Sequence, residues 1–369
     1  MVDAELGDLV QPERGRIHAR LYTDPAIFAA EMRRIFFASW VFVAHDSQVP
    51  DAGSFRTTIA NVPLILTRDH AGAPHAHVDN PAAAELVELA RVEAFAGLIF
   101  ASFAPDVPPL AEHLGLAAPY LEDWAALAPA GRLEATGGVW KYAYRGNWKL
   151  QLEGSNEGYH PDFLHRIGRL ANERNGVPRF EGFAASEARG IDLGGGHSLM
   201  EYPPSTASAG SNAPWIDALA PRLGRERAER IVTRPWRMQL FPNLAIAPDQ
   251  LRVIEPVAVD ATEVRQYHMT TAGAPASVNR ARVRKHSVFN GPAGYGAPDD
   301  VEIFERIQDG CNSLQWPGAL PWVFFNRGVD AERQGERGER IGHTASEVQQ
   351  RAIYYAWLRL MRGGVAAAR

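Results

Sequence analysis

The fold is constrained most by a series of short β-rich runs that is followed by one long helical pattern at the C-terminus. Gly, Pro and Asp turns separate these runs, which lie at 55–59, 63–67, 97–101, 178–190, 237–247 and 251–270. The closing pattern begins at Thr344, where the T-x-x-E spacing to Glu347 predicts a capping box, and it ends at Gly363-Gly364. We therefore expect an α+β fold in which an antiparallel sheet wraps around the terminal helix.

Further elements are predicted around these runs. Residues 25–40 carry an apolar stripe with helical spacing, and a second helix is expected over 300–311. Aromatic residues alternate with charged ones over 140–145, which predicts a half-buried strand. The alanine-rich residues 82–94 fit either a short helix or a connector, whereas residues 204–215, rich in Ser, Pro, Ala and Gly, predict a loop.

A proline-rich segment at 104–109 marks the predicted domain boundary. It separates a region of short strands from a longer region that ends in the terminal helix. We therefore divide the chain into an N-terminal segment and helix (1–40), a β region (41–105) and a larger domain (106–369).

Composition and charge exclude several classes of protein. The net charge of −5 comes from interspersed acids and bases, so no basic face is expected for nucleic acid or an anionic membrane. No apolar run is long enough to cross a bilayer, and the first residues lack a secretory pattern, so a cytoplasmic protein is expected. The single cysteine, Cys311, excludes an internal disulfide and any iron–sulfur cluster held by thiolates of this chain alone.

Two histidines and a carboxylate lie close together between Glu157 and His165. His160 and His165 are five residues apart, so they would not share a face of one uninterrupted helix, but Pro161 disrupts the backbone between them. A helix that ends near His160, followed by a turn, would point both rings at one metal ion. Two imidazoles and one carboxylate form the facial triad of non-heme iron(II) oxygenases. On the spacing alone, two ordinary histidines at a helix end, one packed and one solvated, are the better interpretation.

The residues around the histidines resemble the catalytic-domain motif of Rieske-type non-heme iron oxygenases, the α subunits of aromatic ring-hydroxylating enzymes. The matching positions are Asn147, Trp148, Lys149, Glu153, Glu157, His160 and His165. The resemblance implies that His160 and His165 bind a mononuclear Fe(II), and that Glu157 is the acid that links this iron to the cluster of a neighbouring subunit. It also implies a helix-grip catalytic domain, a trimer, and an aromatic or other hydrophobic small-molecule substrate that reacts with O2.

The third iron ligand must come from far along the chain, and Asp299-Asp300 resembles the acidic pair that opens a late helix in this family. Helical spacing places Asp300 on a stripe with Phe304, Ile307 and Cys311, which is the core-facing pattern. Asp299 lies on a more polar face. Both acids would also suit a helix N-terminus without any metal. We predict that Asp300 is the ligand.

Other residues are candidates for supporting roles. Asp162 and Glu153 are close enough in sequence to hold the imidazoles, since metal-bound histidines usually donate their second ring N–H to a partner. Phe163, Leu164 and apolar positions of the 237–247 strand are candidates to line the substrate pocket. The substrate itself is not identified, and its candidate carboxylate partners are Arg145, Arg234 and Arg237.

The resemblance extends over nearly the whole chain, but both cluster-binding loops of the Rieske domain are missing. Val78-Asp79-Asn80 is followed at once by Pro81-Ala82, where the family has Cys-x-His and later Cys-x-x-His. His70, His75 and His77 precede the gap, and without cysteine partners we expect them to be exposed loop histidines. The β region is therefore a truncated Rieske-like domain for which no [2Fe-2S] cluster is expected.

Three functions fit this pattern. The first is an iron oxygenase with an external electron source, either a cluster-bearing α subunit in a mixed trimer or a separate reductase or ferredoxin. The second is a helix-grip subunit without redox chemistry, which binds a ligand, regulates a partner, or uses the same His/His/Asp site with another metal for hydrolysis. In the third, the loops were lost by engineering or by an annotation error, and the parent protein is an ordinary oxygenase.

Overall fold

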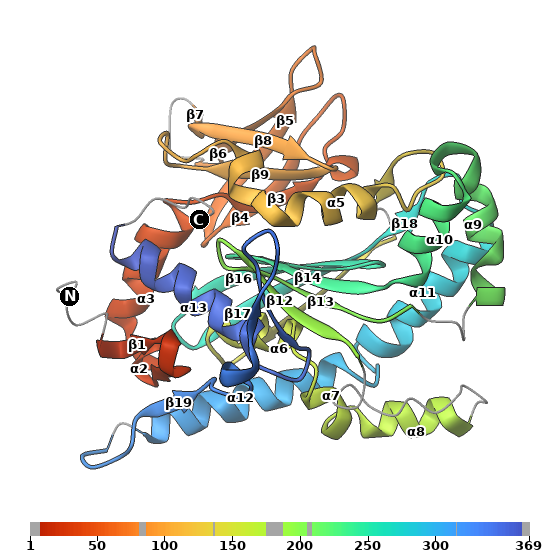
Figure 1. The fold of residues 1–369 in the computed structure, drawn as a ribbon. Helices are drawn as coiled ribbons and strands as arrows, with labels where there is room; N and C mark the ends of the chain where they lie inside the picture. The colour runs from red at the N-terminus through yellow and green to blue at the C-terminus, as the bar shows by residue number, and fades with distance from the viewer. Residues whose placement is uncertain are drawn as a thin grey trace.

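One large antiparallel sheet forms the centre of the molecule, which is shown in Figure 1 as a computed structural model. The structure describes residues 8–80, 86–135, 137–174, 187–204, 209–314 and 316–363. The strand order in the nine-stranded sheet is β11-β17-β16-β15-β14-β13-β12-β21-β20. Its strands are β11 (Val139–Tyr144), β12 (Arg189–Gly194), β13 (His197–Glu201), β14 (Trp236–Leu240), β15 (Leu244–Ala247), β16 (Gln250–Ala258), β17 (Ala261–His268), β20 (Arg333–Gln334) and β21 (Arg340–His343).

The terminal helix α13 (Val348–Met361) packs against this sheet through β12 and β13, which confirms the predicted α+β fold with its helix-grip arrangement. Its apolar side chains, including Ile353 and Trp357, are buried in the core. The predicted capping box is wrong, because the helix starts at Val348 and the Glu347 carboxylate accepts hydrogen bonds from the Tyr159 hydroxyl and the Arg327 backbone instead. The carboxylate that was predicted to cap the helix is thus hydrogen-bonded to groups remote in sequence.

The β region lies on one side of the large sheet, at the top of Figure 1. It contains a three-stranded sheet in the order β3-β9-β8 and a four-stranded sheet in the order β4-β5-β6-β7. The strands are β3 (Val41–His45), β4 (Phe55–Ile59), β5 (Val62–Arg68), β6 (Pro74–Val78), β7 (Val87–Glu88), β8 (Arg91–Phe95) and β9 (Leu98–Ser102). The described part of 82–94 is therefore strand and connector, not a short helix. The domain boundary at 104–109 stays a prediction.

Two of the three histidines predicted to lie in an exposed loop of the β region lie on a strand instead. His75 and His77 lie on β6, between β5 and β7, while His70 is in the preceding turn, as expected. The His75 imidazole contacts Glu88 at 2.6 Å across the strand pair, and this contact raises the pKa of His75. The loop prediction failed here because strand pairing, which is a long-range effect, fixed the segment.

The N-terminal segment is tied to the C-terminal half of the chain. A third sheet joins β1 (Val10–Gln11) and β2 (Arg16–His18) to β19 (Trp322–Phe324). The predicted helix over 25–40 is α3 (Pro25–Glu31), which continues as a π-helical turn over Met32–Phe36. Helix α2 (Arg20–Thr23) lies beside them. A separate two-stranded sheet pairs β10 (Leu133–Glu134) with β18 (Thr270–Thr271).

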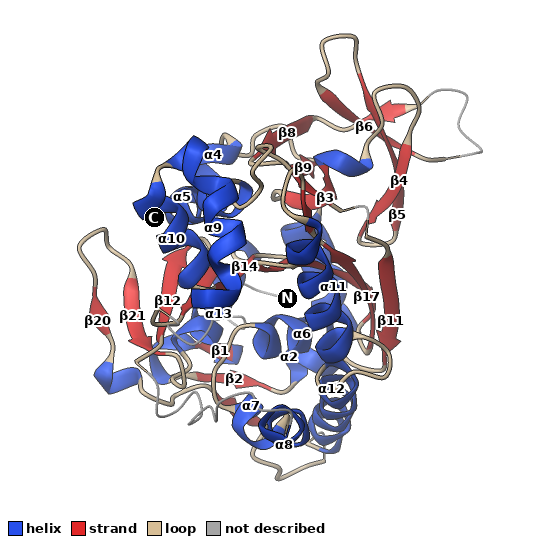
Figure 2. Ribbon diagram, turned by 90° about the vertical axis from the view of Figure 1, so that its right-hand side faces the viewer, coloured by secondary structure: helices blue, strands red, loops and turns tan. Residues whose placement is uncertain are grey.

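Helices cover the ends and one side of the large sheet (Figures 1 and 2). Those that precede or follow the central strands are α4 (Leu110–Leu114), α5 (Ala118–Ala125), α6 (Trp148–Ser155), α7 (His160–Phe163), α8 (Arg166–Arg174), α9 (Ala209–Leu223), α10 (Arg225–Thr233), α11 (Ala276–Asn290) and α12 (Ala297–Ser313). Figure 2 shows α11 and α12 following one another along one side, with α7 beside α12. Among the described residues, no helix is both long enough and apolar enough to span a bilayer.

Several predicted segments differ from the structure. The run 237–247 is two strands, β14 and β15, and the run 251–270 is a hairpin of β16 and β17 with a separate β18. Most of the predicted strand 178–190 lies outside the described residues, and β12 begins at Arg189. The predicted loop 204–215 is wrong from residue 209 onward, where α9 begins.

Candidate metal centre

The two histidines are delivered by a break between helices. Helix α6 begins after Asn147 and ends at Ser155. The Asn147 side chain caps the helix, because it accepts a hydrogen bond from the Lys149 backbone N–H at 3.2 Å. His160 then opens the short helix α7, with Pro161 in its first turn, where a missing N–H costs nothing. His165 lies between α7 and α8. The break predicted near His160 exists, but His160 starts a helix instead of ending one.

The start of α12 brings Asp300 to both imidazoles. The Nε2 atoms of His160 and His165 are 3.2 Å apart, and Oδ1 of Asp300 lies 3.4 Å from the first and 3.2 Å from the second. One ligand atom from each residue lies within 4.8 Å of the others. Asp299 is on the opposite side of the His165 ring, with Oδ2 4.0 Å from Nδ1. The geometry therefore brings Asp300, the acid selected by helical spacing, to the two histidines of the motif.

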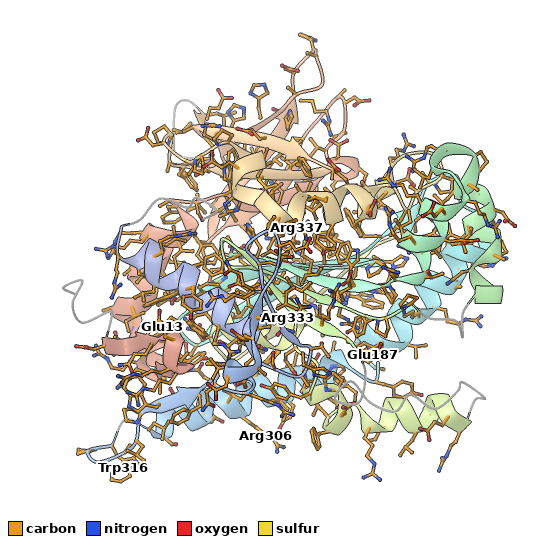
Figure 3. All side chains as sticks on the ribbon, viewed as in Figure 1. Glu13, Glu187, Arg306, Trp316, Arg333 and Arg337 are labelled. Atoms are coloured by element: carbon orange, nitrogen blue, oxygen red, sulfur yellow. The ribbon has the colours of Figure 1, made fainter. Side chains whose placement is uncertain are left out.

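The same helical phase is visible along the rest of α12. Phe304 and Cys311 are buried, as predicted, whereas Ile307 is 39% exposed and does not belong to the core stripe. Arg306 lies on the outer face and forms a 2.8 Å ion pair with Glu302 (Figure 3). The helix is thus amphipathic, and its first turn presents Asp300 to the inside.

Electrostatics keep Asp300 ionised. Burial alone would raise its pKa, but the contacts with His160 and His165 outweigh burial and hold the pKa well below its usual range. A partly buried anion beside two imidazole Nε2 atoms provides three lone-pair donors that lie close together. This donor set fits a divalent metal ion of the iron or zinc kind.

Glu157 holds the His160 ring. Its carboxylate is in short contact with Nδ1 of His160, and it accepts hydrogen bonds from the backbone N–H of Tyr159 at 2.6 Å and of His160 at 3.1 Å. This contact leaves Nε2 of His160 facing Asp300 and His165, which is the arrangement that a carboxylate behind a metal-binding histidine would produce. In contrast, Nδ1 of His165 is buried without a hydrogen-bond partner among the described residues, and its ring packs edge-on against Phe289.

Glu153 does not support the imidazoles, contrary to the prediction from sequence. Its carboxylate accepts hydrogen bonds from the hydroxyls of Tyr22, at 2.8 Å, and of Tyr354. Burial raises the pKa of Glu153 to about 7. Glu153 therefore ties α6 to α2 and α13, and it stabilises the scaffold behind the centre.

A cavity of about 1160 Å³ opens beside the three ligand candidates. Asp162 lines it, but Phe163 and Leu164 do not, and Phe163 is 79% exposed on α7. Of the 237–247 segment, only Arg237 and Ala247 line the cavity. Sequence reasoning missed the wall that α11 contributes, because nothing in that helix's sequence refers to the distant histidines. The residues of this wall are Ser277, Arg280, Ala281, Arg284, Lys285, Val288, Phe289 and Asn290.

Of the three arginines predicted as partners for a substrate carboxylate, one lines the cavity and two do not. Arg237 lines the cavity, whereas Arg145 is paired with Glu305 at 2.8 Å on the surface. Arg234 is exposed and is not part of the cavity wall. Arg252, which the sequence analysis did not single out, is buried in that wall.

Comparison with known proteins gives consistent matches. The family described as "Ring hydroxylating alpha subunit (catalytic domain)" matches residues 132–363. The chain is 29% identical to the 2-halobenzoate 1,2-dioxygenase large subunit of Burkholderia cepacia, with 86% of this chain and 81% of that protein covered. It is 28% identical to the toluate 1,2-dioxygenase subunit alpha of Pseudomonas putida, with 84% and 82% covered.

A solved structure of a naphthalene 1,2-dioxygenase variant bound to phenanthrene has a similar fold. The TM-score is 0.83, with 97% of this chain and 94% of that chain covered. At 20% sequence identity, this likeness concerns the fold alone.

Proposed function

The chain belongs to the family of ring-hydroxylating alpha subunits, and we propose that His160, His165 and Asp300 hold the mononuclear iron(II) at which it oxygenates an aromatic substrate. Family membership makes it an oxidoreductase of the non-heme iron dioxygenase kind, which needs an external electron donor. The observation that carries the site assignment is the convergence of one carboxylate and two imidazole Nε2 atoms beside the cavity.

Each residue of the centre has a distinct task in this proposal. When bound, iron supplies the activation of O2, since three protein ligands leave coordination positions open. Asp300 contributes the negative charge, and its ionised state is favoured by both histidines. Glu157 holds Nδ1 of His160, so that its Nε2 faces the metal position. The cavity beside these residues holds the ring of the substrate.

The substrate class rests on the shared chemistry of the relatives. The names of the two relatives above refer to a halobenzoate and a toluate. An aromatic ring is common to both. We infer that this chain takes a small aromatic molecule and O2.

The electron supply is the part in which this chain differs from the pattern it resembles. Its single cysteine, Cys311, is buried in α12, far along the sequence from the β region. We propose that this chain binds no [2Fe-2S] cluster. Electrons would then come from a cluster-bearing alpha subunit in a mixed trimer, or from a reductase or ferredoxin that serves a homotrimer. In a mixed trimer, Glu157 would lie on the path between the subunits.

The test begins with metal analysis of the protein after anaerobic purification. We expect about one iron per chain. Asp300→Asn should lower iron affinity by at least about tenfold, whereas the matched variant Asp299→Asn should retain it, because Asp299 faces away from Nε2 of His165. Equal losses in both variants, or zinc in place of iron together with hydrolytic activity, would refute the proposal.

The electron source is tested with the iron-loaded protein. Ring oxygenation is measured with reductase and ferredoxin, with and without a cluster-bearing alpha subunit. Product formed only with that subunit supports the mixed trimer, and product formed without it supports direct reduction. No product in either case contradicts the oxygenase function of this chain.

A further inference from the structure

One buried arginine in the cavity wall has no charged partner. Arg252 lies on β16 with 5% of its surface exposed, and it lines the cavity that adjoins the metal centre. Its guanidinium donates to two neutral oxygens, Oγ of Ser155 and Oδ1 of Asn290, both at 3.3 Å. Its Nε is buried without a partner, and among the described residues no ion pair joins this side chain to a carboxylate.

The other buried arginines differ in this respect. Arg265 pairs with Glu255 at 3.2 Å, and Arg351 also contacts a carboxylate. Arg282 donates to two backbone carbonyl oxygens and also lies near the charge of Asp249, which raises the pKa of Arg282 against the effect of burial. A buried cation without a counterion is costly, because desolvation is not offset by Coulomb attraction. Arg252, the exception among these arginines, therefore lies in the wall of the cavity that a ligand would occupy.

The neighbours of Arg252 place it next to the metal centre. Ser155 is two residues before Glu157, which holds His160. Asn290 follows Phe289, whose ring centroid is 5.0 Å from that of His165. Both hydrogen-bond partners of the guanidinium thus come from segments that frame the histidines.

The electrostatics of Tyr142 agree with this placement. Burial raises the pKa of Tyr142, the charge of Arg252 lowers it, and the charge of Asp300 raises it. The cation and the ligand candidate therefore both lie within electrostatic reach of one phenol. An anionic group on Arg252 would hold the rest of a small molecule beside the metal centre.

Other charged residues line the same cavity. Arg280, Arg284 and Lys285 are exposed on α11, and Asp162, Asp249 and Glu173 also belong to the lining. Both signs of charge are therefore present at the cavity surface, so the preference for an anionic ligand rests on the buried Arg252.

We propose that Arg252 is a specificity-determining residue that binds the carboxylate of an aromatic carboxylic acid and so orients its ring toward the metal centre. This inference rests on the proposed function, because it names the class of substrate for that site. A planar guanidinium matches a carboxylate with two parallel hydrogen bonds. An uncharged ring compound of the same size would leave Arg252 buried without a counterion, so it would bind less well.

The experiment compares acids with their uncharged amides. Binding of benzoate, benzamide, 2-naphthoate and 2-naphthamide to the iron-loaded protein is measured anaerobically by calorimetry, without turnover. At least one of the two acids should bind about tenfold or more tightly than its amide, since hydrogen bonds between charged groups are worth one to two powers of ten. Arg252→Gln should abolish this preference while the amide affinity stays within about twofold. Arg252→Lys should retain part of the preference.

Arg234→Gln is the matched control, because Arg234 is exposed and is not part of the cavity wall. It should keep the preference for the acid. The inference is overturned if the parent protein does not distinguish acid from amide, if neither acid binds, or if Arg252→Gln keeps the preference. Equal loss of acid and amide binding in Arg252→Gln also overturns the inference, because Arg252 would then shape the cavity without distinguishing a charged ligand from an uncharged one.

Failure of this inference differs from failure of the proposed function. If only the inference fails, the protein still loads iron and oxygenates an uncharged ring, but binding is indifferent to charge. If only the proposed function fails, the iron-loaded protein oxygenates no ring, yet the acid preference of the cavity persists.

Discussion

The buried carboxylate of Glu31 ties the N-terminal segment to the helix that precedes the candidate metal centre, and the strength of this tie can be tested. It accepts hydrogen bonds from Nε1 of Trp148 at 2.9 Å, from Nζ of Lys149 at 2.7 Å and from Nε1 of Trp357 at 2.7 Å. These contacts join α3 to α6 and to α13. Both members of the Glu31–Lys149 ion pair are fully buried. Because α6 leads directly to His160, this network fixes the position of the centre.

Glu31→Gln removes the charge and keeps the shape. The Lys149 ammonium would then be buried without a counterion, and the amide group would face one of three donors. Breaking a buried ion pair from one side costs about 3–5 kcal/mol, which is a large part of a typical unfolding free energy of about 5–15 kcal/mol. Burial already lowers the pKa of Lys149 against the opposing effect of Glu31, so loss of Glu31 should lower it further.

The assay is urea unfolding followed by circular dichroism, with the midpoint and slope fitted separately. The double variant Glu31→Gln with Lys149→Met should recover about half of the loss, because it removes both charges. Glu302→Gln is the control, since its exposed ion pair with Arg306 should contribute less than about 1 kcal/mol. A loss below about 1 kcal/mol for Glu31→Gln, or strictly additive effects in the double variant, would refute the reasoning.

Two further predictions concern α6 and the segment that follows it. Glu157→Gln should weaken iron binding by about 10–100-fold, because an amide holds Nδ1 of His160 less strongly than a carboxylate does. Competition with a chelator measures the iron affinity, and an unchanged affinity would contradict the role given to Glu157. Glu153, whose pKa is raised to about 7, should contribute stability that is complete below its unfolded value near 4.5 and is lost as pH rises through 7. Glu153→Gln should therefore flatten the decline of the urea midpoint between pH 5 and pH 8, and a parallel pH profile in the variant would exclude this origin.

Local patterns predicted the elements whose burial follows from short-range periodicity. The alternation of Trp140, Tyr142 and Tyr144 became strand β11, with Tyr144 facing the core. The 300–311 helix became α12, and its phase placed Asp300 inside. Both cases depend on the fact that side-chain direction repeats every two residues in a strand and every 3.6 residues in a helix.

The failures have a common physical cause. Residues 209–215 open helix α9, despite Pro214, because Trp215 and Ile216 are buried in a core cluster and Nε1 of Trp215 donates to the Leu127 carbonyl at 2.8 Å. Packing energy of this kind outweighs local propensity. The Glu347 carboxylate likewise does not form the predicted cap, because it accepts hydrogen bonds from Tyr159 and Arg327, which are remote in sequence.

The sequence by itself identified the candidate ligands of this protein, two neighbouring histidines and a distant aspartate in the right helical phase, because residue type and helix phase can be read from the local sequence. Only the tertiary structure decided which groups meet. It brought α12 to α7, separated Glu153 from the imidazoles, and buried Arg252 beside the centre without a counterion. Contacts between residues such as Arg252 and Asn290 depend on how strands and helices pack, and no local pattern encodes that distance.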